Sequence, residues 1–181
     1  IGLRSRRNMV TTKKLPAMLS WRQPQASRRY FELVSEDRTL AALRFPKLTG
    51  TLAEAQADGT SYTFKRSGFL RPKVTIRKAP FDQDIGVVNM SRRGDGEVDM
   101  INGRRYVIRR PSVWSFRWQV FDESDGLMAD VRSRSGLLRL EGKADITEKG
   151  ALSADMLLLL VLEWYIMALI RRDSSTGASG A

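Results

Sequence analysis

The segment 156–170 is apolar on every side of a helix except at Glu163. A helix without a polar face cannot lie on a protein surface in water, because its whole circumference must be removed from solvent. Such a helix is enclosed either by protein or by lipid. Which of the two encloses it decides the fold of a chain like this one.

The lipid environment fits the segment less well. A transmembrane helix needs about 20 consecutive apolar residues, whereas this run has 15, with Glu163 near its middle. A carboxylate at the bilayer centre costs about 2.5–3.5 kcal/mol on insertion scales. Both observations favour enclosure by protein. A C-terminally membrane-anchored protein with a single span at 154–170 is the alternative fold.

Before this segment the chain consists of short stretches that alternate apolar and polar residues, as β-strands with one buried face do. Turn dipeptides such as Asp58-Gly59 and Asn102-Gly103 separate them and are strong hairpin signals. We predict about twelve strands, at residues 19–22, 29–34, 39–44, 49–57, 60–67, 72–78, 84–90, 96–100, 105–109, 113–121, 127–134 and 137–146.

The alternation favours antiparallel pairing, in which each strand has one buried and one solvated face. In 113–121 the side chains of Trp114, Phe116 and Trp118 fall on one face. We expect that face to belong to the core. In 137–146, Leu140 and Ala144 oppose Glu141 and Lys143 in the same way.

A large closed barrel has an interior that its own side chains do not fill. A helix over 154–171 would be roughly 27 Å long at about 1.5 Å per residue, comparable to the height of such a barrel. We therefore predict a mainly β fold, a closed antiparallel β-barrel of about 12 strands around a central hydrophobic C-terminal α-helix. Ser153 or Asp155 is the expected N-cap of the helix, and Arg171 and Arg172 suit its C-terminal dipole.

The barrel domain is expected at 15–172. Residues 1–14 hold five cations and no acid, which predicts a flexible basic leader, and 173–181 (DSSTGASGA) is typical of a flexible polar tail. Met9 is a candidate for the native start. No secretory signal is visible in this leader.

About twelve antiparallel strands followed by the segment 155–165 (DMLLLLVLEWY) resemble the tubby C-terminal-like superfamily. That group includes the tubby proteins, the phospholipid scramblases and the plant LURP-one-related proteins. The resemblance covers about residues 17–172 and implies a closed barrel threaded by its C-terminal helix. It also implies phosphoinositide binding through a basic surface, as in tubby proteins. The palmitoylated cysteines of scramblases have no counterpart in this chain, which contains no cysteine.

The chain also contains no histidine. Thiol nucleophiles, disulfides, thiolate metal sites and the commonest general base are therefore excluded. We expect a non-enzymatic protein without a cofactor. An enzyme with an unrecognised carboxylate-based site is the alternative.

The net charge of +11 favours an anionic partner. We expect docking on anionic membrane lipids or on a protein partner, in the cytoplasm or peripherally at a membrane. Nucleic acid is disfavoured because the aromatic side chains of 113–121 are assigned to the core, and the oligomeric state stays open. The predicted lipid- or phosphate-binding residues are Arg71, Lys73, Arg77, Lys78, Arg92, Arg93, Arg104, Arg105, Arg109 and Arg110.

The chain has two notable acidic features. Asp122, Glu123 and Asp125 gather in one turn and form a candidate calcium site, since calcium prefers oxygen-rich loops. Glu163 needs a partner or a raised pKa if it is buried. Arg66 and Arg44, in phase with the apolar faces of their strands, are its candidate partners. A backbone donor, or a position at a barrel mouth, is the alternative.

Overall fold

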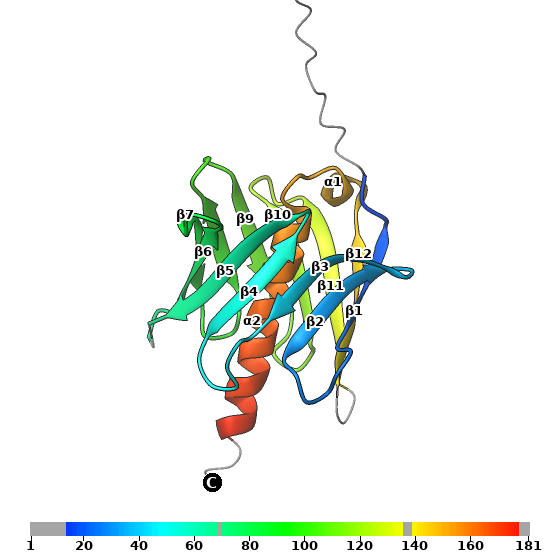
Figure 1. Cartoon of the computed structure of the whole chain (residues 1–181). Helices are drawn as coiled ribbons and strands as arrows, with labels where there is room; N and C mark the ends of the chain where they lie inside the picture. Colours follow the sequence, from blue (N-terminus) through cyan, green and yellow to red (C-terminus); the bar gives the residue numbers. More distant parts are fainter. Residues whose placement is uncertain (1–13, 69, 136–138, 178–181) are drawn as a thin grey trace, which may run out of the picture.

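The computed structural model describes residues 14–68, 70–135 and 139–177. Twelve antiparallel strands form one sheet that closes around a C-terminal helix, which confirms the predicted fold class (Figure 1). The strands follow chain order around the ring. β1 (Met18–Arg22) pairs with β12 (Leu140–Ile146) and closes it.

The strand positions agree closely with the alternation in the sequence. Three strands have the predicted bounds: β5 (Thr60–Ser67), β8 (Gly96–Met100) and β9 (Arg105–Arg109). The others are β2 (Tyr30–Ser35), β3 (Arg38–Arg44), β4 (Leu52–Ala57), β6 (Lys73–Lys78), β7 (Gln83–Met90), β10 (Arg117–Asp122) and β11 (Leu127–Ser135). For the strand predicted at 137–146, residues 137 and 138 lie outside the described part of the chain.

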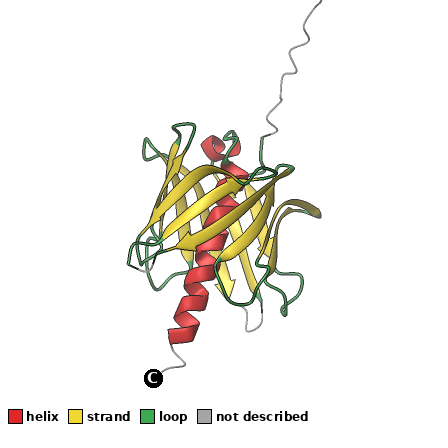
Figure 2. Ribbon diagram, turned by 60° about the vertical axis from the view of Figure 1, so that its left-hand side comes forward, coloured by secondary structure: helices red, strands yellow, loops and turns green. Residues whose placement is uncertain are grey.

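Helix α2 (Met156–Gly177) crosses the barrel interior and leaves it at one end (Figure 2). Every residue from Met156 to Leu169 is buried. Trp164 stacks on Trp21 of β1 with ring centroids 4.8 Å apart, and Tyr165 stacks on Phe45 at 5.7 Å. Among the described residues, no helix has the length and apolar character that a membrane crossing requires.

The predictions missed one element and misplaced the end of another. Short helix α1 (Glu148–Ala151) follows β12, and the hydroxyl of Thr147 accepts a hydrogen bond from the Gly150 N–H at 3.2 Å. Helix α2 continues to Gly177, so 173–177 is helical and not the predicted flexible tail. Residues 178–181, and the predicted leader apart from Lys14, lie outside the described residues.

Strand β10 begins at Arg117 and not at 113, so the prediction that Trp114 and Phe116 belong to the core is wrong, and Phe116 is 36% exposed. The Trp114 side chain is 91% exposed, while Trp118 is fully buried. The preceding residues form a turn, in which the Ser112 hydroxyl accepts a hydrogen bond from the Trp114 N–H at 3.2 Å. Pro111 has no N–H to give to a ladder, and Ser112 offers the backbone a local partner instead.

The antiparallel order places alternate connections at opposite ends of the barrel. The α1 end carries α1 and the beginning of α2, and the C-terminal end is the one from which α2 emerges (Figure 1). The described connections at the α1 end are 14–17, 36–37, 58–59, 79–82, 101–104, 123–126 and 147–155. Those at the C-terminal end are 23–29, 45–51, 68, 70–72, 91–95, 110–116 and 139, together with the helix residues 170–177.

Candidate functional site

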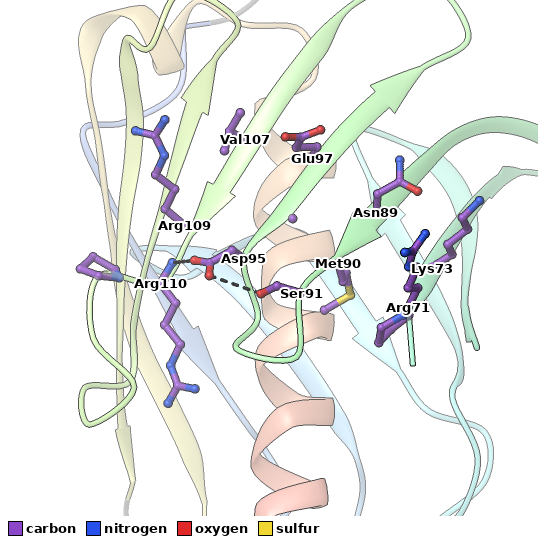
Figure 3. Close-up of a pocket in the computed structure, with 13 residues that line it drawn as sticks. Arg71, Lys73, Asn89, Met90, Ser91, Asp95, Glu97, Val107, Arg109 and Arg110 are labelled. Carbon is purple, nitrogen blue, oxygen red and sulfur yellow. Dashed lines mark hydrogen bonds between the residues drawn. The ribbon is translucent and has the colours of Figure 1, made fainter. Parts of the chain in front are cut away.

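A groove of about 940 Å³ lies on the outside of four neighbouring strands, β6 to β9, towards the C-terminal end (Figure 3). Its floor is one cross-strand row, in which Lys73 pairs with Asn89, Asn89 with Glu97, and Glu97 with Val107. The residues on either side of this row along each strand face the core, because side chains alternate across a sheet. The packing of the barrel core therefore fixes the positions of the residues in this row.

Cations stand on both sides of this floor. Arg71 and Lys73 lie on the β6 side, and Arg109 and Arg110 lie on the β9 side (Figure 3). Arg71 and Lys73 form no ion pair with any described residue, so their charges are available to a ligand. The structure thus brings four of the ten predicted binding residues to one groove.

The other two cations are partly committed within the protein. The Arg109 guanidinium is 2.6 Å from an Asp125 carboxylate oxygen and lies 4.5 Å from the Phe121 ring centroid. Arg110 donates to the Val113 carbonyl oxygen at 2.6 Å, and its guanidinium lies 4.8 Å from the centroid of the Trp118 ring. Both residues line the groove. Their charges are shared with neighbouring groups.

Two acids also line the groove. Asp95 has a structural role, since one of its oxygens accepts the Arg110 backbone N–H at 2.7 Å and the other accepts the Ser91 hydroxyl at 3.3 Å. Glu97, in the middle of the floor, is exposed and forms no ion pair within the described residues. It is therefore the negative charge that an anion in the groove would meet.

The remaining predicted residues divide between the two ends of the barrel. Arg92 and Arg93 lie in the connection 91–95, beside the groove, where the Arg93 carbonyl oxygen accepts a hydrogen bond from Arg110 at 3.3 Å. Four others lie towards the α1 end, where three have acidic partners. The positions and partners are Arg77 (Asp84, 2.7 Å), Arg104 (Asp155, 3.0 Å), Arg105 (Asp99, 3.2 Å) and Lys78 at the end of β6.

Sequence reasoning missed the charge difference between the two ends. The described connections and helix residues at the C-terminal end carry ten cations and two acids, a formal charge of +8. Those at the α1 end carry three cations and eight acids, a formal charge of −5. The signal was present in the sequence, because alternate turns of a meandering barrel lie at the same end. Adding the charges of alternate turns would have found it.

A second groove of about 580 Å³ opens at the C-terminal end on the far side of the barrel, near β2 and β3. Its lining includes Arg28, Arg29 and Arg44. The Arg29 guanidinium lies 3.9 Å from the Phe45 ring centroid, and Arg44 is paired with Glu54. This groove was not anticipated from the sequence.

Two of the three acids of the candidate calcium turn, Asp122 and Asp125, have cationic partners. Asp122 is paired with Lys149, which lowers the pKa of its carboxyl group, and Asp125 is paired with Arg109. Asp122 also accepts the N–H groups of Ser124 and Gly126 at 3.0 and 2.9 Å. Among the described residues, no group of three or more acidic side chains is placed to hold a metal ion.

Glu163 has neither of its predicted arginine partners. It is fully buried, and neither carboxyl oxygen has a hydrogen-bond partner among the described residues. Arg66 pairs instead with Asp173 at 2.7 Å, and Arg44 points outward to Glu54. Burial raises the pKa of Glu163, and the negative charge of Asp130 raises it further.

The comparisons with known proteins bear on the fold. No protein-family profile matches the chain, and no curated protein matches it. A protein from Arabidopsis thaliana with an X-ray structure is 14% identical and superposes with a TM-score of 0.51. The match covers 83% of this chain and 92% of the Arabidopsis chain. At this identity the likeness shows a shared fold alone.

Proposed function

We propose that the chain is a non-enzymatic binding module that holds a phosphate-bearing headgroup in the groove between β6 and β9. The proposal rests on one observation, the unpaired cations Arg71 and Lys73 facing Arg109 and Arg110 across a groove of about 940 Å³. That volume lies in the range of small-ligand sites, about 300–1,000 Å³. It also agrees with the phosphoinositide binding that the resemblance to the tubby C-terminal-like superfamily implies.

The chemistry of the wall suits phosphate. Guanidinium groups donate two parallel hydrogen bonds to phosphate oxygens, and an ammonium group adds a compact charge. Because the groove is open to water, binding should weaken as salt screens these charges. Anionic lipids are concentrated in the cytoplasmic leaflet of membranes. The proposal therefore includes a peripheral location at that surface.

Titration calorimetry with soluble inositol trisphosphate tests the groove without a membrane. Replacing Arg71 and Lys73 together by alanine removes the two unpaired cations and should weaken binding by about tenfold or more, since charge-assisted hydrogen bonds contribute about 1.5–3 kcal/mol each. The matched control replaces Arg77 and Lys78, a cation pair at the other end of the same strand. Equal losses in both double variants, or no binding by the unaltered chain, would refute the proposal.

Glu97 provides a second test with the opposite sign. Replacing it by glutamine removes the unpaired negative charge from the floor while keeping its size. The Glu97→Gln variant should bind inositol trisphosphate more tightly, by several-fold at low salt, and the gain should shrink as salt is added. Weaker binding would show that the phosphate groups do not lie over this floor.

A further inference from the structure

The C-terminal end combines its positive charge with exposed apolar side chains. Leu48, Leu70 and Trp114 are 76%, 71% and 91% exposed and come from three different connections. Cations occupy the same connections, with Lys47 beside Leu48, Arg71 beside Leu70, and Arg110 at the start of the segment that carries Trp114. Each of these exposed apolar side chains therefore shares its connection with a cationic residue.

The segment that carries Trp114 packs against cationic side chains. Phe116, two residues further on, has the guanidinium groups of Arg110 and Arg171 at 6.0 and 5.9 Å from its ring centroid. Arg172, the next helix residue, donates to the Gly50 carbonyl oxygen at 2.5 Å and so ties the end of α2 to the connection 45–51. Trp114 thus projects from a supported surface and not from a free tail.

The exposure of apolar side chains does not by itself distinguish the two ends of the barrel. At the α1 end Phe81 and Ile101 are 89% and 72% exposed. There, however, the described connections carry −5, against +8 at the C-terminal end. An anionic surface attracts one end and repels the other, so the charge difference fixes which apolar tips would meet it.

We propose that the C-terminal end docks on an anionic lipid bilayer, with Trp114, Leu48 and Leu70 inserted below the level of the headgroups. The inference rests on the proposed function only in taking a lipid as the source of the phosphate group. Tryptophan is suited to the membrane interface because its ring is largely apolar and its N–H is polar. Both grooves are lined by residues near this end, so both would lie close to the headgroup layer.

A nucleic acid would use the same cations differently. Strand binding without sequence preference relies on aromatic side chains that stack on successive bases. At this end the exposed tips of two connections are leucines, which have no ring to stack, and both suit hydrocarbon. The observations therefore favour a bilayer, and an oligonucleotide serves as a competitor in the test.

Tryptophan fluorescence reports insertion directly, because Trp21, Trp118 and Trp164 are at most 1% exposed and Trp114 is not. On vesicles of 70% phosphatidylcholine and 30% phosphatidylserine, the emission should shift to shorter wavelength. Phosphatidylcholine brominated in the acyl chains should quench it. The Trp114→Phe variant should show neither change while still sedimenting with the vesicles. Unchanged emission with vesicle-bound protein would overturn the inserted arrangement.

Vesicle sedimentation tests the orientation with matched variants. Replacing Leu70 and Trp114 together by alanine should weaken binding by about tenfold or more, whereas Phe81→Ala with Ile101→Ala should change it less than twofold. All four side chains are exposed, so the folded barrel should survive in both variants. Equal losses, or a larger loss from the α1-end pair, would overturn the proposed orientation. The orientation would also be overturned if a single-stranded oligonucleotide displaced the protein from the vesicles and the brominated lipid had not quenched its fluorescence.

The outcomes for the groove and for the bilayer are separable. Binding of inositol trisphosphate with no vesicle insertion keeps the proposed function and rejects the docking surface. The opposite result is a chain that does not bind inositol trisphosphate but inserts into vesicles, with insertion unaffected by Arg71→Ala and Lys73→Ala. That result keeps the docking surface and rejects the groove.

Discussion

Glu163 places a carboxyl group in the most apolar part of the molecule. It is fully buried, without a hydrogen-bond partner among the described residues, and the pKa of its carboxyl group is raised by burial and by Asp130. A folded-state pKa above the unfolded value means that the folded protein holds this proton more tightly. The free energy of unfolding then falls as the pH rises above the unfolded value of about 4.3.

Glutamine at this position has the same shape and does not ionise. We expect Glu163→Gln and the unaltered chain to differ little at pH 4 and increasingly at higher pH. The variant should gain up to about 1.4 kcal/mol per pH unit until the folded-state pKa is passed. Urea unfolding at pH 4, 5.5 and 7 measures this, with the other titrating groups common to both proteins. If the two proteins showed the same dependence of stability on pH, the Glu163 carboxyl group would not be held protonated in the folded barrel.

Tyr165 ties the helix to the connection 45–51 and to strand β5. Its hydroxyl donates to the Thr51 carbonyl oxygen at 2.5 Å and accepts the Arg66 N–H at 2.8 Å, and burial raises its pKa. Removal of the hydroxyl in Tyr165→Phe leaves both backbone groups without this partner and should cost about 1–3 kcal/mol. Tyr30→Phe is the control, because that hydroxyl bonds the side chain of Glu32 in a half-buried position. Thermal unfolding of both variants should show a loss only at Tyr165.

At the scale of elements, helix α2 and strand β12 are in close contact at Gly142. A Cβ atom there would lie 2.8 Å from the Trp164 ring and 2.8 Å from the Arg132 carbonyl oxygen. Gly142→Ala should therefore cost about 1–3 kcal/mol by overpacking. Adding Trp164→Phe, which removes the outer ring atoms, should recover part of that loss. A double-mutant cycle measured by urea unfolding tests the contact, and strictly additive losses would contradict it.

Most elements were predictable because their information is local. Period-two alternation located the strands, and Asp-Gly and Asn-Gly pairs located hairpins such as 58–59. The error at Trp114 arose because Trp114, Phe116 and Trp118 kept the alternation while the turn at Ser112 interrupted the ladder. Helix α1 has four residues and leaves no periodic signal in the sequence. The groove could not be predicted in this way, because the alternation within a strand does not show which cations form ion pairs.

At the scale of the whole molecule, the barrel and the helix should fold as one unit. The ring is closed by β1 and β12, and its interior is filled by α2, whose residues from Met156 to Leu169 are buried. A chain that ends at Ser153 keeps every strand and leaves the interior empty. We expect this truncation to lose cooperative unfolding and to bind a hydrophobic dye. A chain that ends at Gly177 is the control and should unfold like the full chain in calorimetry.

The order of the elements also has a consequence for how the protein is made. A ribosome releases all twelve strands before it releases the helix around which they close. Until then each emerging hairpin exposes one apolar face, and contacts between the first and last strands are slow to form. Such nascent chains are prone to aggregate. A holding chaperone that covers the strands until α2 appears should therefore raise the yield of folded protein.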